Sequence, residues 1–150
     1  MKWVVLVGLA SLAVVIGVGL WATNFTVYLG DDPTTCNNCH VMDAVYEGWY
    51  HAGHQQWATC NDCHTPHAFI PKYFVKARSG MNHVTMFTLG HIPEPLRAKE
   101  STSNIIQANC IRCHEAAVSM INDGTTDAPH NGGRYCFDCH TSVAHGPRGI

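Results

Sequence analysis

Hydrophobic positions are concentrated at the amino terminus, where Val4 to Ala22 form nineteen consecutive residues without a charge. Lys2 precedes this run, and Trp3 and Trp21 lie near its ends. A helix of this length spans about 30 Å, the thickness of the hydrocarbon core of a bilayer, and tryptophan is favoured at both interfaces. The pattern predicts a transmembrane anchor over residues 1–23, with the amino terminus in the cytoplasm.

The alternative for this segment is a secretory signal peptide that is cleaved after export. The apolar run is longer than the usual signal-peptide core of roughly 7 to 15 residues, and no clear small-residue cleavage site follows Trp21. We therefore expect an uncleaved single-pass anchor in the cytoplasmic membrane, with residues 24–150 exported to the periplasm.

Residues 24–150 contain no second long apolar run and little of the alternation typical of strands. Outside the motifs described below, Tyr73 to Arg78 is the candidate helix, with Lys72 and Lys76 projecting from one face. The pattern predicts a mainly α-helical domain of short helices separated by proline and glycine breaks. The breaks are expected at Pro33, Pro66, Pro71, Pro93, Pro95, Asp123-Gly124 and Asn131-Gly132-Gly133.

Composition narrows the possible functions. Only 13% of the 150 residues are charged, whereas soluble domains carry roughly a quarter. Nine basic residues against eleven acidic ones give a net charge of -2, so nothing favours binding to nucleic acid. The chain also has 8 cysteines and 11 histidines, which indicates ligation of metals or cofactors.

All eight cysteines belong to four copies of C-x-x-C-H, the attachment sequence of c-type haem. Two thiols bond to the porphyrin, and the adjacent imidazole reaches the iron. Zinc and disulfides are the alternatives, but neither requires histidine after every second cysteine. The sequence predicts four covalently bound haems that form most of the domain's core. The thiols are those of Cys36, Cys39, Cys60, Cys63, Cys110, Cys113, Cys136 and Cys139, and the adjacent histidines are His40, His64, His114 and His140.

The motifs form two pairs, because their first cysteines are separated by 24, then 50, then 26 residues. This spacing indicates a duplicated two-haem unit, with halves at about residues 24–91 and 92–150. Seven further histidines could supply the sixth iron ligands, and an ordinary surface or packing role is the alternative for each. They are His51, His54, His67, His83, His91, His130 and His145.

These features together resemble the NapC/NirT family of membrane-bound quinol dehydrogenases. The resemblance rests on the anchor, the paired motifs, the extensions C-x-x-C-H-x-M at 36–42 and CNDCHTPH at 60–67, and MFTLGH at 86–91. The short chain is most similar to the members that serve a periplasmic cytochrome c nitrite reductase. The resemblance implies that menaquinol is oxidised at the membrane and that electrons pass through four haems to that multihaem catalytic subunit.

The resemblance also implies a set of iron ligands. Met42 would replace His40 at the first haem, although without the family it would be taken for a gap-filling side chain. His54 and His145 would be the distal ligands of the haems that carry His64 and His114, with the pairing left open. A residue of the partner would complete the haem of His140. His51, His67, His91 and His130 stay unassigned, and His91 is the strongest spare.

A quinol pocket beside the first haem follows from the same resemblance. Lys76 matches the family's lysine, and the alternative for it is a lysine that snorkels at the membrane interface. His83 occupies the position where an acidic residue is expected, so it would either accept the quinol proton or bind the first iron. A membrane-tethered electron carrier without a quinol site and a quinol dehydrogenase for another reductase are the alternative functions. A sensor is disfavoured, because only Met1 to Trp3 would face the cytoplasm.

Overall fold

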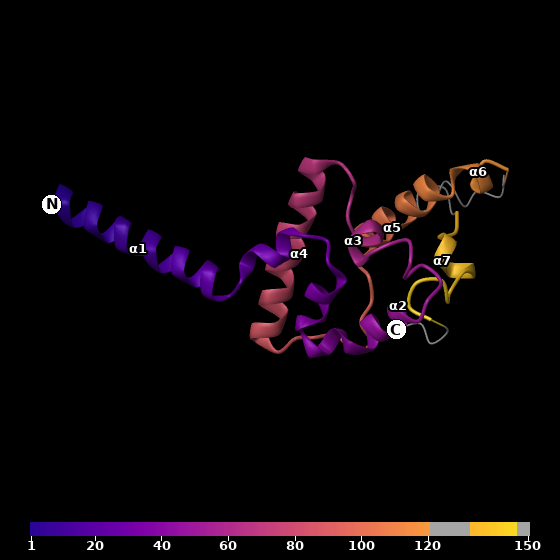
Figure 1. The fold of residues 1–150 in the computed structure, drawn as a ribbon, viewed down its shortest axis with the longest axis horizontal. Helices are drawn as coiled ribbons and strands as arrows, with labels where there is room; N and C mark the ends of the chain where they lie inside the picture. The colour runs from indigo at the N-terminus through magenta and orange to yellow at the C-terminus, as the bar shows by residue number, and fades with distance from the viewer. Residues whose placement is uncertain (121–132, 147–150) are drawn as a thin grey trace. The chain divides into compact units, whose positions relative to one another are not determined.

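The computed structural model describes residues 1–120 and 133–146. These residues form helices and connecting segments without a strand, as the sequence predicts (Figure 1). The chain divides into two compact units, Met1–Asp31 and Asp32–Ile150. The first unit contains the segment expected to be the anchor, residues 1–23, and the second carries all four C-x-x-C-H motifs.

The first unit is built around a single apolar helix, α1 (Lys2–Ala22). Apolar side chains cover all its sides, and Trp3 and Trp21 are exposed near its ends, about 27 Å apart along the axis. A helix that is apolar all round belongs inside a large core or a membrane, and α1 is long and apolar enough to cross a bilayer. A short 3₁₀ helix, η1 (Phe25–Leu29), follows it and contacts it.

The second unit consists of two 3₁₀ helices and six α-helices within its described residues (Figure 1). Most are short, and α4 and α5 are the two long ones. In chain order they are η2 (Pro33–Asn38), η3 (His40–Met42), α2 (Asp43–Tyr50), α3 (Cys60–His64), α4 (Phe69–Leu89), α5 (Glu100–Cys113), α6 (Glu115–Val118) and α7 (Cys136–Cys139).

Helix α4 is much longer than the expected helix at 73–78. The break predicted at Pro71 is wrong, because Pro71 is the third residue of α4, in the first turn, where backbone N–H groups have no helical partner. The helix ends in a Schellman motif: Gly90 has φ +68°, its N–H donates to Phe87 O, and the His91 N–H donates to Met86 O. The MFTLGH sequence is therefore a helix stop signal. The breaks expected at residues 123–124 and 131–132 lie outside the described residues.

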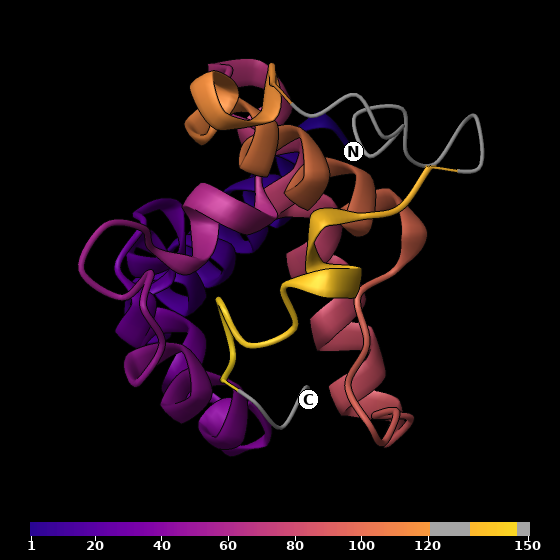
Figure 2. The ribbon, with the colours of Figure 1, turned by 90° about the vertical axis from the view of Figure 1, so that its right-hand side faces the viewer.

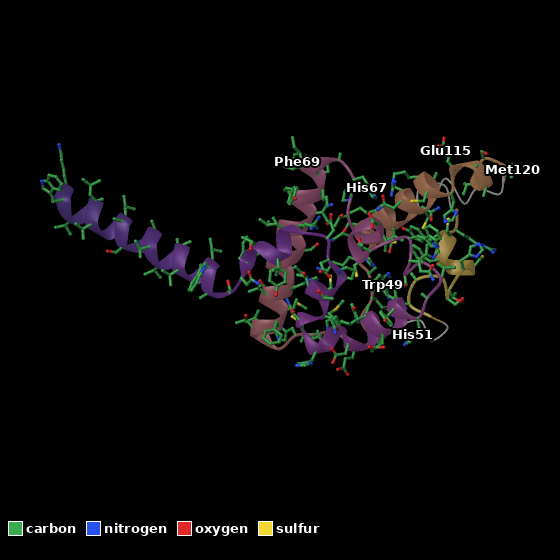
Figure 3. All side chains as sticks on the ribbon, viewed as in Figure 1. Trp49, His51, His67, Phe69, Glu115 and Met120 are labelled. Carbon is green, nitrogen blue, oxygen red and sulfur yellow. The ribbon has the colours of Figure 1, made fainter. Side chains whose placement is uncertain are left out.

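Among the described residues, Trp49 is the only buried hydrophobic side chain, and its Nε1 donates to Ala58 O at 3.0 Å. The buried polar side chains are Thr65, Gln107 and Asn109, which lie where α3 packs against α5. Large apolar side chains remain exposed, including Phe69, which points away from the start of α4 (Figure 3). The polypeptide of this unit thus builds almost no apolar core of its own.

Candidate haem and quinol site

Three of the four C-x-x-C-H motifs lie on α-helix. The second motif is α3 itself, the third forms the end of α5, and the fourth forms α7. Residues three and four apart share one face of a helix, so both thiols and the following imidazole of such a motif are presented on the same side. The helical backbone therefore matches the donor arrangement of covalent haem.

Aspartate at the third position of the motif, which is also the third residue of the helix, caps two of these short helices. The carboxylate of Asp62 accepts from the Thr59 backbone N–H and from the Thr59 hydroxyl, both at 2.8 Å. Asp138 accepts from the Tyr135 N–H at 3.0 Å in the same way. These bonds pair otherwise unpartnered groups at the helix start, which stabilises helices too short to persist alone. The sequence analysis missed this function of the C-x-D-C-H spacing.

The first motif differs, and the expectation that every motif lies on a short α-helix is wrong here. Cys36 lies in η2, but Cys39 has extended backbone, with φ -106° and ψ 118°. The chain therefore changes direction before His40, whose side chain is 99% exposed and lies 3.3 Å from the Asp43 carboxylate. The Met42 N–H donates to Cys39 O at 2.8 Å and closes a 3₁₀ turn. In this motif the histidine side chain therefore faces solvent, and Met42 lies two residues further along the chain.

Two histidine pairs meet across the domain. The ring centroids of His54 and His114 are 6.0 Å apart, with planes inclined at 78°. Those of His64 and His145 are 6.1 Å apart, inclined at 53°. A metal bonded on both faces by imidazole nitrogens at about 2 Å places the ring centroids about 6 Å apart. Each pair joins the histidine of one motif to a histidine outside the motifs.

Both non-motif histidines are oriented by backbone carbonyls. His54 Nδ1 donates to Val143 O at 2.9 Å, and His145 Nδ1 donates to Val45 O at 3.2 Å. A proton held on Nδ1 leaves Nε2 as the ligating nitrogen. The two bonds also tie the segment before Gly146 to α2, and Figure 2 shows this C-terminal segment passing beside α2. Gly48 permits the close approach, because a Cβ there would overlap the His145 carbonyl.

The imidazole of His64 is held in its neutral form. Burial, assisted by the neighbouring His145, lowers the pKa of His64 to about 4. Burial disfavours the charged form of an imidazole, and a second imidazole nearby adds repulsion. His64 is therefore unprotonated at neutral pH, as an iron ligand must be.

Interactions between the thiols give the spatial order of the motifs. A hydrogen bond with Cys60 lowers the pKa of Cys36 to about 7, so the first cysteines of motifs one and two adjoin. Burial, with the nearby Cys136, raises the pKa of Cys110 to about 11, so motifs three and four adjoin as well. Burial, with Asp62 and Cys113 nearby, raises the pKa of Cys63 at the junction of motifs two and three. The four motifs thus follow one another in space as in sequence.

Side-chain amides on α5 join three of the motifs. Asn109 Nδ2 donates to Cys63 O and to Thr65 O, both at 2.9 Å. Gln107 Oε1 accepts from the Cys136 N–H at 2.9 Å, and Asn104 Oδ1 accepts from the Tyr135 hydroxyl at 2.7 Å. Helix α5, which ends in motif three, therefore also holds motifs two and four. No motif in the sequence signals these residues.

Lys76 and His83 lie on one face of α4, seven residues apart. The positive charge of Lys76 contributes to the lowered pKa of Cys36, so Lys76 lies within electrostatic range of the first attachment site. Burial, with the positive charge of Lys99 nearby, lowers the pKa of His83. His83 is therefore neutral at pH 7 and can accept a proton.

The unassigned histidines have other partners. His51 Nε2 lies 3.4 Å from the Glu47 carboxylate on the surface. His67, located between α3 and α4 in Figure 3, accepts from the Arg112 guanidinium at 2.6 Å. The backbone N–H of His91 completes the C-terminal cap of α4, and His130 lies outside the described residues.

The donor set fits c-type haem. In three of the four motifs the thiols lie on an α-helix, and two imidazole pairs have the separation that iron requires. In each pair, Nδ1 of the histidine outside the motifs donates a hydrogen bond to a backbone carbonyl. Since the described chain buries one hydrophobic side chain, four macrocycles would also supply the missing apolar interior.

The apolar helix and this donor set together define a membrane-anchored c-type cytochrome. The chain belongs to the NapC/NirT cytochrome c family, whose N-terminal region matches residues 1–148. The resemblance on which the sequence analysis relied is thereby confirmed.

Two curated relatives resemble almost the whole chain. The cytochrome c-type protein NrfH of Wolinella succinogenes is 36% identical over 155 aligned positions, covering 97% of this chain and 88% of the relative. The cytochrome c nitrite reductase subunit NrfH of Nitratidesulfovibrio vulgaris is 35% identical over 144 positions, covering 92% and 86%.

A solved structure is similar in fold as well. A chain in the crystal structure of the cytochrome c nitrite reductase NrfHA complex bound to the HQNO inhibitor matches with a TM-score of 0.68 and 33% identity. The match covers 95% of this chain and 90% of that chain. The expected helical fold with one amino-terminal anchor is therefore shared with a solved relative.

Proposed function

We propose that this chain is a membrane-anchored menaquinol dehydrogenase that delivers electrons to a periplasmic cytochrome c nitrite reductase. The observation that carries the proposal is that the charge of Lys76 acts on Cys36, at the first of four consecutive attachment sites. The similarity to NrfH chains, one of them in a complex with a bound HQNO inhibitor, supports both the substrate class and the partner. When bound, the haems carry the electrons one at a time.

Two of the four irons are assigned protein ligands on both faces. The 6.0 Å separation supports His54 as the second ligand of the haem of His114, and the 6.1 Å separation supports His145 as the second ligand of the haem of His64. This pairing connects the two halves of the domain, because each histidine outside the motifs pairs with a motif histidine of the other half. The order Cys36–Cys60–Cys63–Cys110–Cys136 of neighbouring thiols supports electron transfer in the order of the sequence.

The first and fourth irons have one assigned protein ligand each. Met42 would hold the first, because His40 turns to Asp43 and solvent while Met42 closes the following turn. A thioether ligand gives a higher potential than a second imidazole. His140, which is exposed at the end of α7, would hold the fourth, and a residue of the partner reductase would complete that iron.

The quinol is oxidised on the face of α4 that carries Lys76 and His83. The Lys76 ammonium would hold a quinol oxygen and favour its deprotonated form, since a positive charge stabilises a developing oxyanion. Oxidation of the quinol releases two protons and two electrons; the neutral imidazole of His83 accepts the two protons in turn and releases each to the periplasm. The amino terminus and Lys2 remain in the cytoplasm, and α1 anchors the chain in the inner membrane beside the quinol pool.

Stopped-flow absorbance of the detergent-purified holoprotein with a menaquinol analogue tests the proposal, after a pyridine haemochrome assay has counted four haems. Rapid reduction that HQNO blocks is expected. Lys76→Ala should slow it at least about tenfold while dithionite still reduces every haem. Arg78→Ala is the matched control, because it removes a nearby exposed positive charge from another face of α4.

The outcomes separate the candidate functions. Loss of both quinol and dithionite reduction in Lys76→Ala would assign Lys76 a structural function. No reduction of the unsubstituted protein by quinol, with four dithionite-reducible haems, would overturn the proposal and favour an electron carrier that receives electrons from another protein.

A further inference from the structure

We infer that Asn109 is a positioning residue: it fixes the orientation of the iron ligand His64 and couples it to the attachment site of the third haem. Asn109 lies on α5, and its side chain is 7% exposed. The inference rests on the proposed function only through the assignment of His64 and His145 as ligands of one iron.

The contacts of Asn109 bracket His64. Its Nδ2 donates to Cys63 O and Thr65 O at 2.9 Å each, the carbonyls of the residues directly before and after His64. Both partners can only accept, so the orientation of the carboxamide is determined by its surroundings. One buried amide therefore holds the backbone on both sides of the ligand.

The local backbone needs such a clamp. Helix α3 has five residues, so its last carbonyls have no partner within the helix, and the chain turns extended at Thr65 with φ -128° and ψ 150°. Thr65 is buried, and its hydroxyl donates back to Asn61 O at 2.8 Å. Without Asn109, the part-buried Cys63 carbonyl and the buried Thr65 carbonyl on either side of the ligand would lose this donor, and the backbone could compensate by rotating.

Asn109 also links the two halves of the domain. The next residue, Cys110, is the first attachment thiol of motif three, so the residue that clamps His64 directly precedes a haem bond. Movement of α5 would therefore change the geometry of motifs two and three together. Outer groups that orient a ligand typically affect metal properties almost as strongly as the ligand does.

Gln107 provides a matched control on the same helix. It is more deeply buried, at 2% exposed, and it is also a carboxamide, but it accepts from the Cys136 N–H in motif four. Gln107→Leu should disturb motif four and leave His64 unchanged, whereas Asn109→Leu should disturb His64. A general loosening of α5 would affect both sites in both variants.

Electron paramagnetic resonance of the oxidised, detergent-purified holoprotein tests the inference. In low-spin ferric haem the largest g value depends on the angle between the two imidazole planes, which is 53° for His64 and His145. Asn109→Leu should shift the largest g value of this haem while the pyridine haemochrome assay still counts four haems. Asn109→Ser, which is smaller and keeps one hydrogen-bond donor, should shift the same signal by less. This variant replaces Asn109→Leu in the test if the leucine variant does not incorporate its haems.

His145→Ala identifies the signal, because it removes one ligand of this haem. If Asn109→Leu and Asn109→Ser leave every g value unchanged, or if Gln107→Leu gives the same shift, the inference is overturned. If Asn109→Leu shifts a signal that survives in His145→Ala, the clamp stands and the ligand assignment fails.

Discussion

The imidazole rings of His54 and His114 form a T-shaped pair, with centroids 6.0 Å apart and planes inclined at 78°. His54 follows α2 in the first half of the domain, and His114 ends the third motif in the second half. The bond from His54 Nδ1 to Val143 O fixes the ring while leaving Nε2 for a metal. The two halves are therefore joined through histidine pairs as well as through packing.

His54→Ala should convert one low-spin haem to a five-coordinate haem that binds carbon monoxide. The change removes the distal ligand of the third haem and leaves its attachment intact. We expect carbon monoxide binding by the reduced protein to rise by about one per chain, measured by absorbance titration.

His51→Ala is the control for this variant. His51 is only three residues away, but it is exposed and its Nε2 lies 3.4 Å from the Glu47 carboxylate. It should leave carbon monoxide binding unchanged. Binding that also rises in His51→Ala would mean that the segment after α2 has moved, and the ligand assignment of His54 would lose its support.

Gly48→Ala should destabilise the contact between α2 and the C-terminal segment. A Cβ at Gly48 would overlap the carbonyl of His145, so one of the two segments must shift. We expect a loss of about 1–3 kcal/mol in the free energy of unfolding, as for other overpacked sites, measured as a lower melting temperature of the holoprotein. Displacement of His145 should also alter the spectrum of the second haem.

Gly53→Ala is the matched control, because a Cβ there meets nothing within 4 Å. Its effect on the free energy of unfolding should stay within about 1 kcal/mol. Equal losses in the two variants would show that the contact between Gly48 and His145 contributes no more than glycine flexibility does.

Asp62→Ala should remove the cap of α3. The carboxylate accepts two hydrogen bonds from Thr59, and loss of such a cap costs about 1 kcal/mol. The melting temperature of the holoprotein should fall, whereas Asp43→Ala, which removes the exposed partner of His40, should leave it unchanged. An unchanged melting temperature in Asp62→Ala would mean that the attached haem alone fixes α3.

The features that could be predicted from the sequence depend on local patterns. The anchor follows from an uninterrupted apolar run, and the attachment sites follow from a fixed five-residue spacing. The pairing of His54 with His114 could not be predicted, because it depends on which distant segments meet. The sequence pattern underestimates the length of α4, because a proline at position 71 predicts a break, whereas a proline in the first turn of a helix removes no helical hydrogen bond.

Other parts of the site have no signal in the sequence. Asn109 and Gln107 lie in an ordinary helical stretch, and only the packing of α5 against α3 gives each amide a backbone partner. The exposure of His40 depends on the extended backbone of Cys39. The sequence CNNCH does not show that this motif differs in backbone conformation from the helical motifs. Tertiary contacts decide both features.

Quinol oxidation should have an acid limit set by His83. Burial and the positive charge of Lys99 both lower the pKa of this imidazole below its ordinary value of 6.5. The neutral form accepts the proton, so the rate should be constant above that pKa and fall as the pH drops through it. Stopped-flow reduction rates measured from pH 4.5 to 8 test this, as the pH range brackets the titration of a histidine.

Lys99→Gln should move this acid limit to higher pH. The substitution removes the positive charge that disfavours protonated His83, so the pKa of His83 rises and protonation begins earlier as the pH falls. Glutamine keeps a donor for Asn82 Oδ1, which accepts from the Lys99 ammonium at 2.7 Å. Arg97→Gln removes an exposed charge two residues away and should leave the limit in place.

The contradicting outcomes concern the group that accepts the proton. An acid limit that stays fixed in Lys99→Gln, or that persists in His83→Ala, would assign the proton to another group. A first haem that becomes five-coordinate in His83→Ala would instead make His83 its iron ligand.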